Sequence, residues 1–209
     1  MEQFVTISGV AAPLMRSNID TDLLIPSREM TGTGRDGYGE KLLAHWRYLP
    51  SPGGARVENP DFVLNQMPFR HAVILLAGDN FGSGSSRETA VWAVRQFGFR
   101  CVIAPSFGTI FRNNCYRNGV LPVVLPAADV EALAHEAESG KLHLTVDLGE
   151  FAVIHPSGNR WTFSIPAGER SMLLAGLDAI GMTLKHRAEI EAFQSADRKS
   201  RPWIWSEQR

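Results

Sequence analysis

The sequence predicts an α/β protein with a parallel sheet in its middle third and a β-meander after it. Two observations carry this prediction. Between residues 72 and 139, apolar runs of strand length alternate with helical patterns, as in crossover units that build a parallel sheet. From residue 142 on, strand-like segments follow one another through tight turns, which is typical of antiparallel strands.

Each expected element has a local reason. The buried strands are continuous apolar runs, because parallel strands are covered on both faces. They are expected at Ala72–Ala77, Cys101–Ala104 and Val120–Leu125, after an N-terminal strand at Phe4–Ser8. Helices are expected at Glu88–Phe97, Phe107–Tyr116 and Ala127–Ser139, and glycine or Asn-Gly follows the last two. The meander is expected at Leu142–Asp147, Phe151–His155 and Trp161–Ile165, followed by helices near Gly168–Leu177 and Leu184–Gln194.

The N-terminal region between these elements is irregular. Thr31–Gly39 carries four glycines in nine positions, so it needs a partner to order it. A short helix is expected at Glu40–Tyr48, before the Pro-Gly-Gly turn. We predict a single domain over residues 1–209, with an irregular, mobile region at about 28–60 and a flexible tail at 197–209.

Composition excludes several classes of protein. The chain has 209 residues and a net charge of -1 with no basic block, which argues against nucleic-acid binding. No apolar run approaches the roughly 20 residues that a membrane helix needs, and the N-terminus lacks a signal-peptide pattern. The only cysteines, Cys101 and Cys115, fit neither a disulfide framework nor a metal motif. We therefore expect a cytoplasmic protein that binds no nucleic acid, membrane or metal.

The segment Gly78–Glu88 carries the chemistry. It joins a buried strand to a helix, which is where α/β proteins bind ligands. Its glycines allow backbone N–H groups to approach a bound group, and the helix start and Arg87 favour an anion. The spacing excludes a P-loop, a dinucleotide fingerprint and a hydrolase nucleophile elbow. A carboxylate site with two serines remains, and Ser85-x-x-Glu88 also fits a plain capping box.

An ordered set of segments resembles a known family. It comprises Gly78–Glu88 itself, Asn18–Asp22 with Leu24–Pro26, Trp46–Tyr48, Asn59–Asn65, Ile103–Phe107 and Gly176–Leu184. Together they resemble the swivelling domain of the aconitase superfamily, and in particular the small subunits of bacterial 3-isopropylmalate dehydratases. The resemblance covers the chain to about Phe193. It implies a swivelling β/β/α domain of a two-subunit hydro-lyase that interconverts 2-isopropylmalate and 3-isopropylmalate, through 2-isopropylmaleate, in leucine biosynthesis.

The resemblance also implies roles for individual residues. Ser85 aligns with the catalytic serine that removes a proton from the carbon next to a carboxylate, a task that requires a stabilised alkoxide. Gly84, Ser86 and Arg87 are expected to bind the dicarboxylate substrate. Arg35 lies in the glycine-rich loop that the family places near the substrate, although a solvated loop arginine is the alternative.

The cofactor implied by the family does not fit on this chain alone. A site-differentiated [4Fe–4S] cluster takes three cysteine ligands, and this chain has two cysteines. The cluster is therefore expected in a large-subunit partner, with none bound here. Trp203 and Trp205 either dock the tail on that partner or belong to a frayed end.

One position departs from the family's loop. The family commonly has histidine after S-S-R-E, whereas this chain has Thr89. A related hydro-lyase acting on citraconate, a methylmalate or homoaconitate is therefore an alternative. A non-catalytic anion-binding or regulatory module is the alternative from another class.

Overall fold

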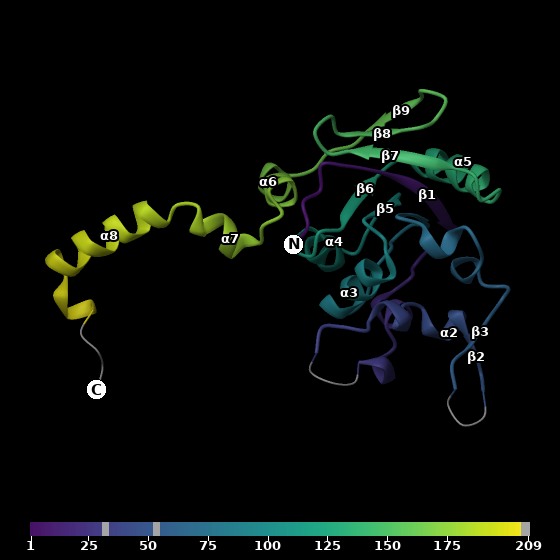
Figure 1. Ribbon diagram of the computed structural model, residues 1–209, viewed down its shortest axis with the longest axis horizontal. Coiled ribbons are helices and arrows are strands. Elements are labelled where there is room, and N and C mark those ends of the chain that lie inside the picture. The colour runs from purple at the N-terminus through teal and green to yellow at the C-terminus, as the bar shows by residue number, and fades with distance from the viewer. Residues whose placement is uncertain (31–33, 52–54, 206–209) are drawn as a thin grey trace.

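The computed structural model describes residues 1–30, 34–51 and 55–205. Its main sheet has seven strands in the order β6-β5-β4-β1-β7-β8-β9 (Figure 1). The strands are β1 (Thr6–Leu14), β4 (Ile74–Ala77), β5 (Cys101–Ala104), β6 (Leu121–Val124), β7 (His143–Asp147), β8 (Ala152–Ile154) and β9 (Arg160–Thr162). The predicted α/β class is confirmed, and the parallel part and the meander belong to one mixed sheet.

Strand β1 joins the two parts because it has different neighbours along its length. Its first half, Thr6–Val10, pairs antiparallel with β7, and its second half, Ala11–Leu14, pairs parallel with β4. Pro13 lies in the second half, where β7 no longer pairs, so its missing N–H removes no bond from the β1–β7 ladder. The predicted strand at Phe4–Ser8 was therefore too short and began too early.

Helices cover both faces of the sheet. Successive residues of β4 point to opposite faces, so Leu75 enters one hydrophobic core and Ile74 the other. On the first face lies α3 (Glu88–Phe97), and on the second lie α5 (Ala127–Ala137) and α6 (Ala167–Ala175). Helix α4 (Thr109–Arg117) contributes Phe111 and Cys115 to the first core and Tyr116 to the second.

The N-terminal region forms short elements instead of one helix. They are α1 (Thr21–Leu24), η1 (Ser27–Glu29), η2 (Gly39–Lys41), α2 (Ala44–Arg47), β2 (Tyr48–Leu49), β3 (Val57–Glu58), η4 (Val63–Asn65) and η5 (Phe69–His71). The helix predicted at Glu40–Tyr48 was wrong, because Leu43 has a left-handed φ of 51° that separates η2 from α2. Residues 31–33 and 52–54 lie outside the described part of the chain, and the mobility expected near 28–60 stays a prediction.

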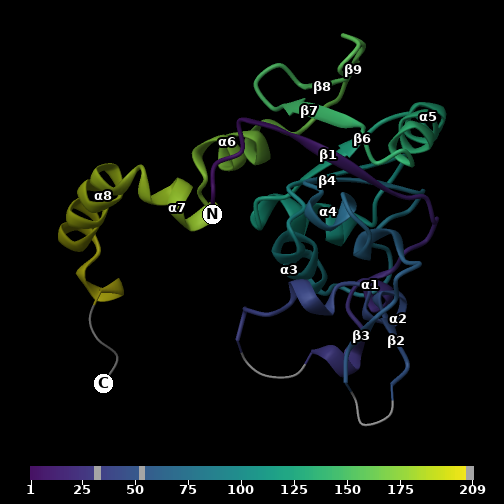
Figure 2. The same ribbon diagram turned by 45° about the vertical axis from the view of Figure 1, so that its right-hand side comes forward.

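The C-terminal elements leave the body of the molecule. They are α7 (Ala179–Leu184), α8 (Arg187–Ser200) and η6 (Pro202–Ile204), and Figures 1 and 2 both show them projecting beyond α6. The single helix predicted at Leu184–Gln194 is two helices in the structure. The tail from residue 197 contains the end of α8 and η6, while residues 206–209 fall outside the described residues. No helix in the described ranges is long and apolar enough to cross a membrane.

Candidate active site

The serine loop, Gly78–Glu88, connects β4 to α3, as predicted. Its backbone turns sharply, with left-handed φ values at Asn80, Gly82 and Gly84 of 56°, 72° and 88°. At Gly82 a Cβ atom would come within 2.2 Å of the Phe111 ring, so no side chain fits there. The glycine is therefore required by both the conformation and the close packing of the loop on α4.

Two neighbouring segments fix the loop's backbone. They supply backbone hydrogen bonds of 2.7–3.1 Å: Asn18 N–H to the Asp79 carbonyl, Gly82 N–H to Ile19, Thr21 N–H to Ser83, Phe81 N–H to Ser106 and Gly108 N–H to Phe81. The Ser106 hydroxyl adds to this by accepting from the Asn80 N–H at 2.8 Å and donating to the Asp79 carboxylate. The backbone before Gly84 is thus held in place on both sides.

Ser85 and Ser86 lie at the exposed tip of the loop. The Ser85 carbonyl accepts from the Thr21 hydroxyl at 3.0 Å and from the Arg87 N–H at 2.8 Å. Neither serine hydroxyl makes a hydrogen bond to another described residue, and both side chains are open to solvent. The hydroxyls are therefore available to a ligand, at the N-terminal end of a ten-residue helix.

The capping-box alternative does not hold for this helix. The N-cap of α3 is Arg87, with no side-chain capping bond, and the Glu88 carboxylate accepts from the Asn118 side chain at 2.9 Å instead. The first-turn N–H groups of α3 consequently have no carboxylate or hydroxyl cap among the described residues. Such groups favour an anion in front of the helix.

Arg87 is held by Asp22, a residue that by sequence fits an ordinary turn or cap. The Arg87 Nη1 atom is buried and forms an ion pair with the Asp22 carboxylate, without the alignment of a hydrogen bond. The contact with Arg87 lowers the pKa of Asp22, and the Ser27 hydroxyl donates to the same carboxylate at 3.2 Å. The side chain of Arg87 is 20% exposed, so part of the guanidinium is anchored while the rest reaches the surface.

Arg35 does not join this group. Its guanidinium lies over the ring of Trp92 at 5.2 Å, and its carbonyl accepts from the Gln96 side chain. Both partners belong to α3, further along the helix than the serine loop. Among the described residues the structure brings Gly84, Ser85, Ser86 and Arg87 together and leaves Arg35 apart, so a role of Arg35 in binding substrate stays a prediction.

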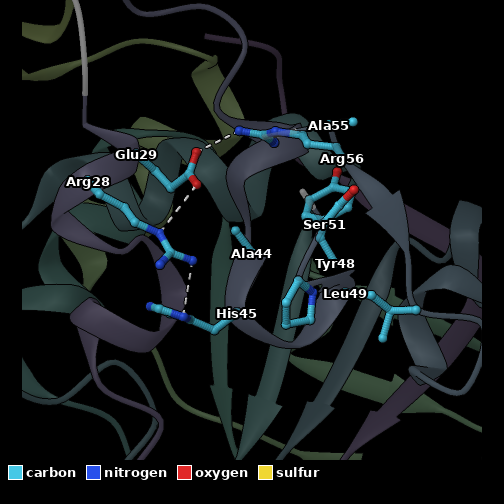
Figure 3. Close-up of a pocket in the computed structure, with 10 residues that line it drawn as sticks. Arg28, Glu29, Ala44, His45, Tyr48, Leu49, Ser51, Ala55 and Arg56 are labelled. Carbon is cyan, nitrogen blue, oxygen red and sulfur yellow. Dashed lines mark hydrogen bonds and ion pairs between the residues drawn. The ribbon is translucent and has the colours of Figure 1, made fainter. Parts of the chain in front are cut away.

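A separate hollow of about 570 Å³ opens beside η1 and α2 (Figure 3). Three basic side chains line it, but Arg28 and Arg56 face Glu29 at 3.8 and 2.6 Å, and His45 contacts Arg28 at 3.3 Å. The Glu29 carboxylate already pairs with both arginines and offsets one of their two charges, whereas the guanidinium of Arg87 in the serine loop lies beside an uncapped helix end. The sequence offered no signal for it.

Both cysteines of the chain lie in its interior. Cys101 and Cys115 are both unpaired and buried, and burial raises the pKa of each thiol well above its usual value. A site-differentiated cluster takes three cysteine ligands, and this chain has two cysteines, both packed in the hydrophobic cores. In the part of the chain that the structure describes, no group of three or more His, Cys, Asp or Glu residues lies close enough to hold a metal ion.

Comparisons with known proteins agree with this geometry. Residues 1–128 match the family model of the aconitase C-terminal domain, and residues 180–204 match that of the C-terminal domain of the 3-isopropylmalate dehydratase small subunit. A crystal structure of 3-isopropylmalate dehydratase from Methanocaldococcus jannaschii shares the fold, with a TM-score of 0.63 and 24% identity. The match covers 90% of this chain and 99% of that one.

Relatives of similar length carry one common name, 3-isopropylmalate dehydratase small subunit. The protein of Cupriavidus necator is 55% identical over 206 residues, which cover 98% of each chain. That of Gluconacetobacter diazotrophicus is 48% identical over 204 residues, with 97% of each chain covered. That of Dechloromonas aromatica is 45% identical over 212 residues and covers 99% of this chain and 100% of its own. The chain belongs to the family of 3-isopropylmalate dehydratase small subunits, within the aconitase superfamily.

Proposed function

We propose that this chain is the small subunit of a heteromeric hydro-lyase that interconverts 2-isopropylmalate and 3-isopropylmalate through 2-isopropylmaleate in leucine biosynthesis. The observation that carries the proposal is the serine loop. It presents two unbonded hydroxyls and an anchored arginine in front of an uncapped helix. This arrangement suits a small dicarboxylate, and relatives of matching length bear the corresponding name.

In this proposal Ser85 is the base. A serine hydroxyl is a weak base in water, so it can remove a proton from carbon only where positive charge stabilises its alkoxide. The N-terminal end of α3 and the Arg87 guanidinium provide positive potential next to Ser85. Exclusion of water by a second subunit would strengthen both effects, because charges interact more strongly in a low dielectric.

Arg87, Ser86 and Gly84 bind the substrate in the same proposal. The outer guanidinium nitrogens of Arg87 match a carboxylate in a forked, bidentate contact. Ser86 can donate a further hydrogen bond. Gly84 leaves its backbone accessible, since it is exposed and carries no side chain. The proton to be removed is thereby placed next to Ser85 by groups of this chain alone.

The second half of the site is assigned to a large subunit. Because this chain has two buried cysteines and the cluster takes three, we place the [4Fe–4S] cluster in that partner, where it would supply the Lewis acid for the leaving hydroxide. The chain alone should then be inactive and colourless. Its buried, unpaired thiols suit a reducing compartment such as the cytoplasm.

The test is Ser85→Ala in the complex with the cluster-loaded large subunit. We expect kcat for isopropylmalate isomerisation to fall by roughly 10²–10⁴-fold with little change in KM, because the serine acts mainly in the transition state. Ser83→Ala is the matched control, since that residue lies in the same loop before Gly84. Unchanged turnover of the Ser85 variant would favour the non-catalytic anion-binding or regulatory module.

The second candidate function is the same type of reaction on a related substrate, and the position of Thr89 motivates it. The Thr89 hydroxyl, next to the serine loop, lies 3.4 Å from the Met30 sulfur. Threonine here makes this wall of the loop smaller than histidine would. Assays of the complex against isopropylmalate, citraconate, methylmalate and homoaconitate separate the candidates, and turnover of citraconate without isopropylmalate would overturn the leucine assignment.

A further inference from the structure

The C-terminal arm, residues 179–205, is the most exposed part of the described chain. It consists of α7, α8 and η6, and two views show it extending from α6 away from the sheet (Figures 1 and 2). Large apolar side chains along it are between 55 and 70% exposed: Ile180, Leu184, Phe193, Trp203 and Ile204. An apolar surface of this kind marks an interaction site.

The end of the arm is ordered by its own contacts. Asp197 on α8 is 8% exposed and accepts from the Arg201 guanidinium at 2.6 Å and from the Trp205 indole N–H at 2.9 Å. These bonds fix the turn between α8 and η6. The arm is therefore a preformed helical element, which binds with a smaller loss of conformational entropy than a flexible tail.

The family models indicate which partner the arm fits. By its name, the model matched by residues 1–128 describes a C-terminal domain, which is part of a longer chain. Here the domain is a separate chain, so the high effective concentration given by a covalent link is lost. The segment 180–204 matches a model specific to small subunits, and it coincides with the arm. An added interface in this segment would replace the missing covalent link.

The position of the arm agrees with such a partner. In Figure 2 the yellow end of the arm beyond α8 lies at about the same height as α1, on the other side of the view. The serine loop is bonded to α1 through the Thr21 N–H and the Asp22–Arg87 pair. A partner that covers the serine loop would have to extend across the molecule to contact the arm as well.

We propose that the arm docks on the large subunit, in an apolar groove with an acidic rim, and keeps the two chains together. The expected rim follows from the arm's charge, since residues 179–205 carry five Lys or Arg and three Asp or Glu side chains. The inference rests on the proposed function for the identity of the partner. It adds that attachment is separate from the catalytic face, so the large subunit can move away from the serine loop for substrate exchange while the complex stays assembled.

The test compares two full-length variants that add the same charge to opposite sides of α8. Phe193→Asp alters the apolar side, and Ser195→Asp, two residues on, alters the polar side. We expect Phe193→Asp to weaken binding of the purified large subunit at least about tenfold, because a central apolar anchor is worth more than 1 kcal/mol. The Ser195 variant should bind as the original chain does. At saturating concentrations of either variant, kcat for isopropylmalate should be unchanged.

Each other outcome has a definite meaning. Equal affinity of the two variants for the large subunit overturns the docking arm. So does a Phe193 variant that loses only self-association in sedimentation, because the arm would then bind a second copy of this chain. Arm-dependent binding without isopropylmalate turnover would support the docking arm and overturn the assigned reaction. Turnover of isopropylmalate together with binding that does not depend on the arm would support the assigned reaction and overturn the docking arm.

Discussion

At the scale of single residues, the serine loop combines a fixed backbone with unbonded hydroxyls. The backbone hydrogen bonds that hold residues 79–83 are made with residues 18–21 and 106–108, whereas Ser85 and Ser86 are exposed to solvent. Rigid support under exposed reactive groups is what a site needs if it is to bind a substrate without rearranging.

A substitution at Gly82 tests how much the packing of the loop on Phe111 contributes to stability. Gly82→Ala places a methyl group against Phe111 and forces a side chain into a left-handed backbone, so we expect the free energy of unfolding to fall by about 2–4 kcal/mol. Gly158→Ala is the control, since its φ of 95° is also left-handed but no atom lies within 4 Å of the added Cβ. Urea unfolding of both variants measures the difference. Equal losses would mean that packing on Phe111 contributes nothing.

Asp22 is expected to act through Arg87. The pKa of Asp22 is lowered by its contact with Arg87, so the carboxylate stays ionised throughout the neutral range and the pair is lost only in acid. Asp22→Asn should release the guanidinium and raise KM for the dicarboxylate roughly tenfold, the scale of one charge-assisted contact. Stability should hardly change, because the Asp22 side chain is 53% exposed.

Ser27→Ala serves as the control for Asp22, since it removes the other hydrogen bond to the same carboxylate at 3.2 Å. Steady-state kinetics of the reconstituted complex give both values. A KM that is unaffected by Asp22→Asn contradicts the positioning role.

At the scale of residues, the serine loop could be predicted from the sequence, but the ion pair that holds Arg87 could not. Ser85, Ser86 and Arg87 were recognisable because glycines, hydroxyls and a guanidinium converge at a strand-to-helix junction. The partner of Arg87 was not, because Asp22 lies 65 positions earlier and also fits an ordinary turn. A contact across that distance leaves no local pattern in a single sequence.

At the scale of elements, agreement is best where burial alone determines the structure. Helix α3 and strand β5 begin and end where they were predicted, since an apolar stripe or a wholly buried run specifies each. Strand β1 was extended by tertiary pairing past Gly9 and Pro13, residues that usually discourage a strand. Residues 39–47 were misassigned because the left-handed φ of Leu43 has no sequence signal.

The N-terminal segment is tied to α3 and β5 by charge. Glu2 contacts Arg95 on α3 and Arg100, just before β5, at 2.7 and 2.6 Å. The pKa of Glu2 is lowered from 4.5, mainly by attraction to Arg100. A carboxyl with a lowered pKa stabilises the fold above its ordinary pKa, and this stabilisation disappears as the pH falls through the lowered value.

Glu2→Gln should therefore lower stability at pH 7 and lower it less at pH 3, because the stabilisation by the carboxylate is lost as the pH falls through its lowered pKa. Urea unfolding at the two pH values measures this. The control is Glu131→Gln on α5, an exposed carboxylate with no ion pair among the described residues. Equal destabilisation by Glu2→Gln at both pH values would show that the contact is not electrostatic.

At the scale of the whole molecule, both cysteine thiols are completely buried. Cys101 lies in β5 and Cys115 in α4, and burial raises the pKa of both. We expect both to resist thiol reagents at pH 8 until the chain unfolds globally, so that their labelling follows the unfolding rate. Ser195→Cys, on the exposed arm, should label within seconds and is the positive control. Rapid labelling of the original chain would contradict the buried positions.

The same mixed sheet has a consequence for synthesis on the ribosome. The two partners of β1 emerge long after it: Ala11 pairs with Ile74, and Thr6 pairs with Asp147. At about 5–20 residues per second, the first strand waits roughly 7–30 s for its last neighbour. Both edges of β1 are unpaired until β4 has emerged, and the edge that faces β7 stays unpaired until the end of the interval. Nascent chains of this subunit should therefore depend on chaperones until about two-thirds of the polypeptide has been translated.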